Sequence, residues 1–155
     1  MYDVFLFVHS WFRWIVVIAG LRLFYILVKA HIENKIWSSV ESKTLALFNE
    51  ALFFQVALGI PLYLFLSPLP KIGWNDLDFA LKDPAFRFWT IEHPVGMLSG
   101  FIIFQIGRLM ALKKFSIQKR LKVITITLAL SFLIILSSIP WPFLKHGRNL
   151  FRFYF

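Results

Sequence analysis

The sequence contains no cysteine and few charged residues. The absence of Cys among its 155 residues excludes disulfides, thiolate catalysis, iron–sulfur clusters and zinc sites with cysteine ligands. Only 16% of the residues are Asp, Glu, Lys or Arg, against about a quarter in an ordinary soluble domain. So few charges cannot cover the surface of a chain that is 59% hydrophobic. A water-soluble globular enzyme is therefore excluded, and intrinsic disorder with it.

Apolar and aromatic side chains dominate the sequence instead, and 19% of the residues are Phe, Trp or Tyr. A helix that crosses a membrane needs about 20 mostly apolar residues. The sequence predicts an all-α fold, a bundle of four transmembrane helices that forms a single domain over residues 1–155. The spans are expected at Val4–Val28, Leu45–Leu66, Phe88–Ala111 and Leu121–Ile139. Residues 67–87 are expected to form an ordered external loop.

The charges that are present are mostly basic, with 17 Lys and Arg against 8 Asp and Glu and a formal net charge of +9. In a membrane protein this excess marks cytoplasmic loops and contact with anionic lipid, so the predicted partner is the bilayer and not nucleic acid. Nine basic residues lie in or beside the first and third connectors, and six in the second connector and the tail. This bias predicts both termini on the external side. The nine are Lys29, Lys35, Lys43, Arg108, Lys113, Lys114, Lys119, Arg120 and Lys122; the six are Lys71, Lys82, Arg87, Lys145, Arg148 and Arg152.

Ionisable residues inside the expected spans mark the candidate site, because such residues are costly in hydrocarbon and usually face a pathway or a ligand. His9 and Arg13 are four residues apart on the first span and share a face. Glu92 and His93 lie in the outer part of the third span. His9 and His93 are each five residues past the expected start of their helix, roughly 7.5 Å deep. The chain after the fourth span adds Trp141, His146 and Arg148 on the same side.

Two histidines at equal depth on different helices are typical of the axial ligands of a b-type haem. The residue spacing therefore makes His9 and His93 candidate ligands of a haem iron in an outer pocket. Arg13 or Arg148 is expected to bind a haem propionate, and His146 is a further candidate for contact with the cofactor. No catalytic residue is predicted.

Three other interpretations of the same residues remain open at this point. His9, Arg13 and Glu92 could satisfy one another in a structural polar network, with Arg13 and Glu92 as an ion pair. A quinone head group could bind through His93 or His146. A zinc site could be drawn from His9, His93 and Glu92, since zinc takes three or four ligands at one centre.

A second polar layer is expected near the opposite surface, from Arg22, Glu50 and Gln105. Arg22 is about 220° round the helix from His9 and points away from it. Because either charge alone would be costly in hydrocarbon, Arg22 and Glu50 are predicted to form a structural ion pair. A role in proton transfer or quinone binding is the open alternative for these residues.

Small and helix-breaking residues in the third span predict its packing. Gly96 and Gly100 form a G-x-x-x-G pattern, which favours close helix packing within the bundle. Pro94, directly after His93, removes a backbone donor and is expected to leave a carbonyl free near the pocket.

Four local runs resemble, in the same order, a family of small bacterial four-helix membrane proteins described as cytochrome b-like. The most specific is the EHP block with the R-F-W that precedes it. The runs are HSWFRW (His9–Trp14), DPAFRFWTIEHPVGM (Asp83–Met97), IGR (Ile106–Arg108), and IPWPF (Ile139–Phe143) followed by GR (Gly147–Arg148).

The resemblance implies a b-type cytochrome of the bacterial inner membrane, or a subunit of a membrane redox complex, with His9 and His93 as haem ligands. Relatives often carry another histidine before a Gln-x-x-x-Gly stretch in the second span. Here Phe53 and Phe54 precede Gln55 and Gly59. The expected function is electron transfer through one haem b. The alternatives are a quinone-binding membrane anchor and a cofactor-free accessory subunit of a larger respiratory or transport complex.

Overall fold

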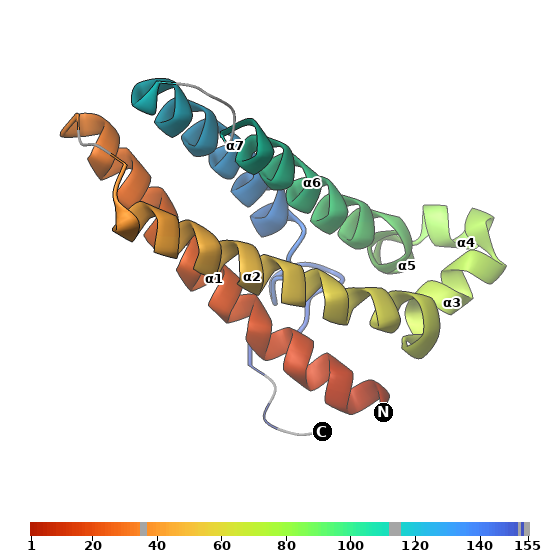
Figure 1. Cartoon of the computed structure of the whole chain (residues 1–155). Coiled ribbons are helices and arrows are strands. Elements are labelled where there is room, and N and C mark those ends of the chain that lie inside the picture. Colours follow the sequence, from red (N-terminus) through yellow and green to blue (C-terminus); the bar gives the residue numbers. More distant parts are fainter. Residues whose placement is uncertain (35–36, 112–115, 152, 154–155) are drawn as a thin grey trace.

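The structure is a computed structural model that describes residues 1–34, 37–111, 116–151 and 153, and no strand occurs among them (Figure 1). Lys35, Lys113, Lys114 and Arg152, which entered the charge comparison, lie outside these residues. The helices, two of them π-helical, are α1 (Tyr2–Ile32), α2 (Ser39–Pro61), η1 (Leu62–Leu66, π-helical), α3 (Pro68–Asn75), α4 (Leu77–Lys82), α5 (Pro84–Arg87), η2 (Phe88–Glu92, π-helical), α6 (His93–Ala111) and α7 (Ile117–Ser137).

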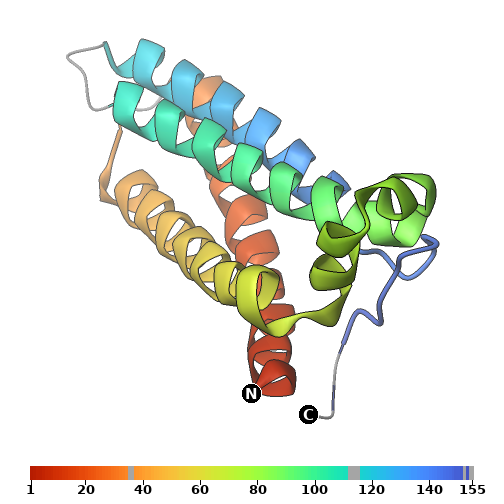
Figure 2. The same cartoon turned by 90° about the vertical axis from the view of Figure 1, so that its right-hand side faces the viewer.

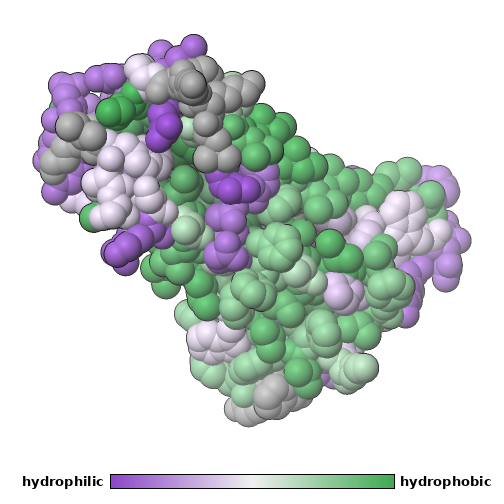
Figure 3. Space-filling view, in the orientation of Figure 1, coloured by the Kyte–Doolittle hydropathy of each residue, from purple (hydrophilic) through white to green (hydrophobic). Residues whose placement is uncertain are grey.

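Four helical stretches are long and apolar enough to cross a membrane: Tyr2–Ile32, Ser39–Leu66, Pro84–Ala111 and Ile117–Ser137. The predicted all-α, four-helix fold of an integral membrane protein is therefore confirmed. Figure 3 shows an apolar middle between more hydrophilic ends. We call the end that holds α3, α4, α5 and the N terminus the outer end, and which side of the membrane it faces stays a prediction.

The helix boundaries follow from local capping residues. Ser38 and Glu41 form a capping box at the start of α2, in which each side chain accepts from the other residue's backbone N–H. At the third span, Asp83 Oδ1 accepts from the N–H groups of Ala85 and Phe86 at 2.9 and 3.0 Å, and Pro84 occupies the first helical turn. The connector of residues 67–87 contains the short helices α3 and α4 where the sequence predicted a loop.

The long helices pack as two antiparallel pairs, α1 with α2 and α6 with α7, and α7 also packs against α1 (Figures 1 and 2). A cluster of fully buried apolar side chains lies toward the inner end. There Phe48 of α2 and Phe104 of α6 are fully buried and meet edge to face, with ring centroids 4.8 Å apart. Leu23, Leu27 and Leu128 are buried around them.

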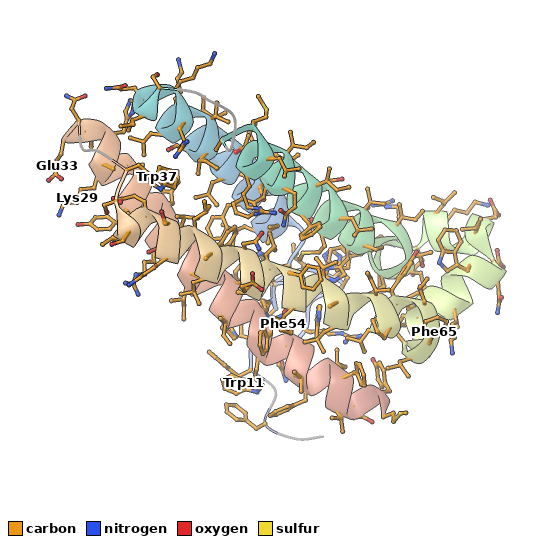
Figure 4. The ribbon with its side chains drawn as sticks, viewed as in Figure 1. Trp11, Lys29, Glu33, Trp37, Phe54 and Phe65 are labelled. Carbon is orange, nitrogen blue, oxygen red and sulfur yellow. The ribbon has the colours of Figure 1, made fainter. Side chains whose placement is uncertain are left out.

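Labelled side chains show the two ends of the bundle in Figure 4. Lys29, Glu33 and Trp37 lie where α1 joins α2, and Trp11 and Phe65 lie toward the outer end. Phe54 and Phe65 are 52% and 66% exposed on the second span. In a bilayer such side chains face lipid, which accounts for the many aromatic residues of the chain.

Glycines of the third span let α6 approach α7 closely, as the G-x-x-x-G pattern predicted. A Cβ atom at Gly100 would lie 2.7 Å from Ile135 Cγ1 and 3.1 Å from the Ser131 carbonyl oxygen. Gly96 lies in the same way against the Ser138 side chain. The Ser131 hydroxyl donates to the Gly100 carbonyl at 2.7 Å. The prediction of close packing within the bundle is confirmed.

Substitution of Gly100 is expected to destabilise the bundle. In Gly100→Val the added side chain meets Ile135 and the α7 backbone, and overpacking of this kind costs about 1–3 kcal/mol. Unfolding by SDS in mixed micelles measures the loss. Ile102→Val, at a 52% exposed position of the same helix, is the matched control and should leave the unfolding midpoint nearly unchanged. Equal midpoints for the two variants would contradict this packing.

Candidate functional site

An apolar pocket of about 270 Å³ lies in the outer half of the bundle and is lined by all four long helical stretches. A smaller pocket of about 60 Å³ lies next to it, nearer the outer end. His9, Gly59, Tyr63 and His93 line both pockets. The two histidines therefore stand at the boundary between an apolar interior and the outer end.

The structure brings His9 of α1 and His93 of α6 together. Their ring centroids are 6.5 Å apart and their planes cross at 76°. Gly59 of α2 makes room beside them, because a Cβ atom there would lie 3.2 Å from His9 Cε1. Residue counting predicted that His9 and His93 lie at equal depth on two helices, and in the structure their rings approach each other directly.

His93 is held by a backbone carbonyl. Its Nδ1 lies 2.8 Å from the carbonyl oxygen of Ser138, at the end of α7. Because a carbonyl only accepts hydrogen bonds, Nδ1 carries the proton and Nε2 carries the lone pair. Phe88 and Trp89 flank the ring, with centroids 5.6 and 5.4 Å away.

His9 is held by Gln55 of α2. The Gln55 side-chain amide nitrogen lies 3.2 Å from His9 Nε2 and donates to the His9 carbonyl oxygen at 3.1 Å. With the amide nitrogen as donor, His9 Nε2 accepts, so its lone pair points at the Gln55 N–H. His9 Nδ1 and Gln55 Oε1 are enclosed without hydrogen-bond partners.

Positive charge gathers at the pockets. Arg13 is only 9% exposed; its Nη2 donates to the Leu150 carbonyl at 2.6 Å, and its Nε is enclosed without a partner. Arg148 lines the smaller pocket and lies over the Trp89 ring, 4.1 Å from its centroid. Among the described residues, no Asp or Glu lines either pocket. A buried cation without an acidic partner favours an anionic ligand.

Two of the residues predicted for this site lie elsewhere. Glu92 accepts from Arg87 Nε at 2.6 Å, so the expected network and ion pair of Glu92 with Arg13 are wrong. Arg87 is simply nearer, on the preceding turn. His146 lines neither pocket and stacks on Phe88, with ring centroids 3.6 Å apart. It lies behind the ring that flanks His93.

Arg22 and Glu50, which were predicted to pair, do not form an ion pair in the described part of the chain. Both side chains are exposed. Each side chain reaches the surface by itself. Glu50 accepts from Asn49 at 3.3 Å. Gln105 donates to Asn49 at 2.9 Å and accepts from Arg108 Nε at 2.9 Å. The inner polar layer exists, but it joins α2 to α6 without Arg22.

Sequence reasoning missed Gln55 and Tyr63 as site residues. Tyr63 donates to the Thr90 carbonyl at 2.8 Å and accepts from Trp74 Nε1 at 2.9 Å. Pro94 offers no N–H to Thr90, four residues earlier, so this is the free carbonyl that Pro94 predicted. The available signal for Gln55 was its spacing from Gly59, because residues four apart share a helix face.

Within the described ranges, no group of three or more His, Cys, Asp or Glu side chains is placed to hold a metal ion. The zinc interpretation is therefore not supported, since Glu92 turns to Arg87. No protein-family model, curated protein or solved structure matches the chain. The interpretation of the site thus depends on its own geometry.

The stack of His146 on Phe88 predicts a dependence of stability on pH. Burial holds the pKa of His146 below its ordinary value, against an opposing effect of Glu92. The folded protein thus favours the neutral ring, and stability is lost as the pH falls below the unfolded-state pKa of about 6.5.

Thermal unfolding in detergent at pH 7.5 and pH 5 measures this loss. His146→Phe keeps an aromatic ring on Phe88 but cannot titrate, so its melting temperature should fall less on acidification than that of the wild type. An identical fall in the two proteins would contradict the assignment.

Proposed function

We propose that this membrane protein binds one b-type haem between His9 and His93 and transfers electrons within the bilayer. The observation that carries the proposal is the approach of the two rings to 6.5 Å between centroids. An imidazole nitrogen binds a first-row metal ion at about 2.0–2.1 Å, which puts the centroids of two ligating rings roughly 6 Å apart. The spacing of His9 and His93 fits an iron between them.

The protonation of the two rings supports the same proposal. His93 Nε2 is free because Nδ1 donates to the Ser138 carbonyl, and a ligating histidine usually donates its other ring N–H to an acceptor of this kind. His9 Nε2 accepts from the Gln55 amide, and a metal ion would replace that N–H as the group that takes its lone pair.

The charges around the pocket support a ligand with carboxylates. Arg13 Nε lacks a partner, Arg148 lies at the other side of the histidines, and both guanidinium groups act electrostatically on both rings. Two propionates would supply the missing negative charge through charge-assisted hydrogen bonds. The aliphatic lining, which includes Val16, Leu52 and Ile135, would exclude water from an apolar macrocycle.

A bound haem supplies one-electron oxidation and reduction, and the protein supplies the ligands, the charge and the dry environment. His9 and His93 would hold the group, and Arg13 and Arg148 would orient it. The charge bias of the loops favours a site toward the external side, and the resemblance of the four sequence runs implies a bacterial inner membrane. The partners in such a role are other subunits of a membrane redox complex or a lipid-soluble carrier.

Absorption spectra of the purified protein, oxidised and then reduced with dithionite, test the proposal. The wild type should show a Soret band that shifts on reduction, and the band should be lost or strongly altered in His9→Ala and His93→Ala. His31→Ala and His146→Ala are matched controls, because neither residue lines a pocket, and both should keep the wild-type spectrum. A wild-type protein without haem after expression with sufficient haem would overturn the proposal.

A quinone is the second candidate ligand, favoured by the exposed residues at the pocket. Ile60, Leu64 and Leu98 line the pocket and are 46%, 53% and 43% exposed on lipid-facing helices, which suits lateral entry of an isoprenoid tail. Solvent extraction of the purified protein tests this candidate. Quinone in the extract of the wild type, and less quinone per chain in His93→Ala, would support quinone binding. If the purified protein holds neither haem nor quinone and other chains co-purify with it stoichiometrically, a cofactor-free accessory subunit is favoured.

A further inference from the structure

Two charged side chains of opposite sign lie exposed on the first two spans of the bundle. Arg22 of α1 and Glu50 of α2 are both exposed, and both belong to helical stretches that are long and apolar enough to cross a membrane. Among the described residues neither takes part in an ion pair, and Glu50 accepts from its sequence neighbour Asn49 at 3.3 Å. Because a charge inside a span usually pairs with another polar group, both side chains need partners outside this chain.

The two charges lie at similar depth in the bundle. Gly20 of α1 and Phe48 of α2 meet in the core, where a Cβ atom at Gly20 would lie 3.0 Å from Phe48 Cε2. The two helices are antiparallel (Figure 1), so Arg22 lies two residues nearer the inner end than Gly20. Glu50 lies two residues nearer the outer end than Phe48. Four residues at 1.5 Å each separate the charges by about 6 Å in depth, which two long side chains bridge.

The two charges also lie on one face of the α1–α2 pair. The rings of Phe12 and Phe54 meet between the two helices, with centroids 6.1 Å apart. At 100° per residue, Glu50 lies about 40° round α2 from Phe54, and Arg22 lies about 80° round α1 from Phe12. Ile18, one turn before Arg22, and Phe54 are 65% and 52% exposed. We call this surface, with Ile18, Arg22, Glu50 and Phe54, the α1–α2 face.

We propose that the α1–α2 face binds a second copy of this chain, with Arg22 of each copy paired to Glu50 of the other. A twofold interface requires a surface that is complementary to itself, and a face with one charge of each sign meets this requirement. A twofold axis normal to the membrane leaves every residue at its own depth, so the similar depth of the two charges lets both pairs form. Polar contacts of this kind hold transmembrane helices together.

A second copy fits the α1–α2 face better than lipid does. Anionic headgroups attract basic side chains, so they would neutralise Arg22 but repel Glu50. A second copy supplies a carboxylate to the one and a guanidinium to the other in the same contact. The remaining exposed side chains of the face, Ile18 and Phe54, are apolar and suit packing between helices. None of the four residues lines a pocket, so the interface leaves the candidate haem site to each chain.

The test counts chains per assembly in a lipid bilayer. The chain contains no cysteine, so Asn75→Cys, at an exposed position of the connector between the second and third spans, gives one site for a fluorescent maleimide. The labelled protein is reconstituted in phosphatidylcholine–phosphatidylglycerol liposomes over a range of dilutions, and single-molecule photobleaching counts the chains. The expected result is two chains that separate on dilution. A single chain at every dilution overturns the inference.

Charge reversal in the labelled protein then tests the pairing. Arg22→Glu and Glu50→Arg each place like charges across the interface, and each should raise the dissociation constant of the dimer about 10-fold, because two pairs are lost per dimer. The double variant Arg22→Glu/Glu50→Arg restores both pairs with exchanged signs and should return the constant close to that of the wild type. Lys122→Glu, at an exposed position of α7, is the matched control and should leave it unchanged.

The outcomes separate this inference from the haem proposal. A double variant that dimerises no better than the single variants, or an equal effect of Lys122→Glu and Arg22→Glu, overturns the pairing of Arg22 with Glu50. A protein that holds no haem but dimerises through these two charges supports the interface and overturns only the proposed function. Circular dichroism checks that every variant keeps the helix content of the wild type.

Discussion

The organisation of the outer half of this bundle depends on one constraint: in hydrocarbon, every polar group of the backbone needs a partner within the protein. Pro94 at the outer end of α6 removes a helical donor, and the last carbonyls of α7 lie where the helix ends after Ser137. The carbonyls of Thr90, Leu136 and Ser138 accept from Tyr63, Trp141 and His93. Helix termination, side-chain orientation and the presentation of His93 to the pocket are therefore parts of one arrangement.

The same constraint applies to charge. Arg13 is buried beside an apolar pocket, and its only hydrogen-bond acceptor among the described residues is the carbonyl of Leu150. The C-terminal segment that provides this carbonyl also packs Phe151 against Trp14, with ring centroids 5.3 Å apart. A polar contact of this kind satisfies one N–H but not the charge. The surplus positive charge is the strongest physical reason to expect a ligand with carboxylates in the pocket.

Hydropathy alone predicted the four spans, because a span of about 20 apolar residues has few alternatives. Counting residues from the span ends was sufficient to predict that His9 and His93 lie at the same depth. Both residues line the pockets. The same counting failed for pairs. Arg22 and Glu50 do not meet, and Glu92 turns to Arg87, because partner choice depends on helix rotation and on nearer residues. Gln55 was missed because an uncharged side chain in a span carries little signal by itself.

The central proposal is that His9 and His93 would both hold the iron of one haem. Low-temperature electron paramagnetic resonance of the oxidised protein tests it most directly, because two imidazole ligands give low-spin ferric haem. The planes of the two rings cross at 76°, and near-perpendicular planes give the strongly anisotropic form of the low-spin signal. The account predicts that signal from one haem per chain. A high-spin signal, or no haem signal from protein purified with its histidines intact, would contradict it.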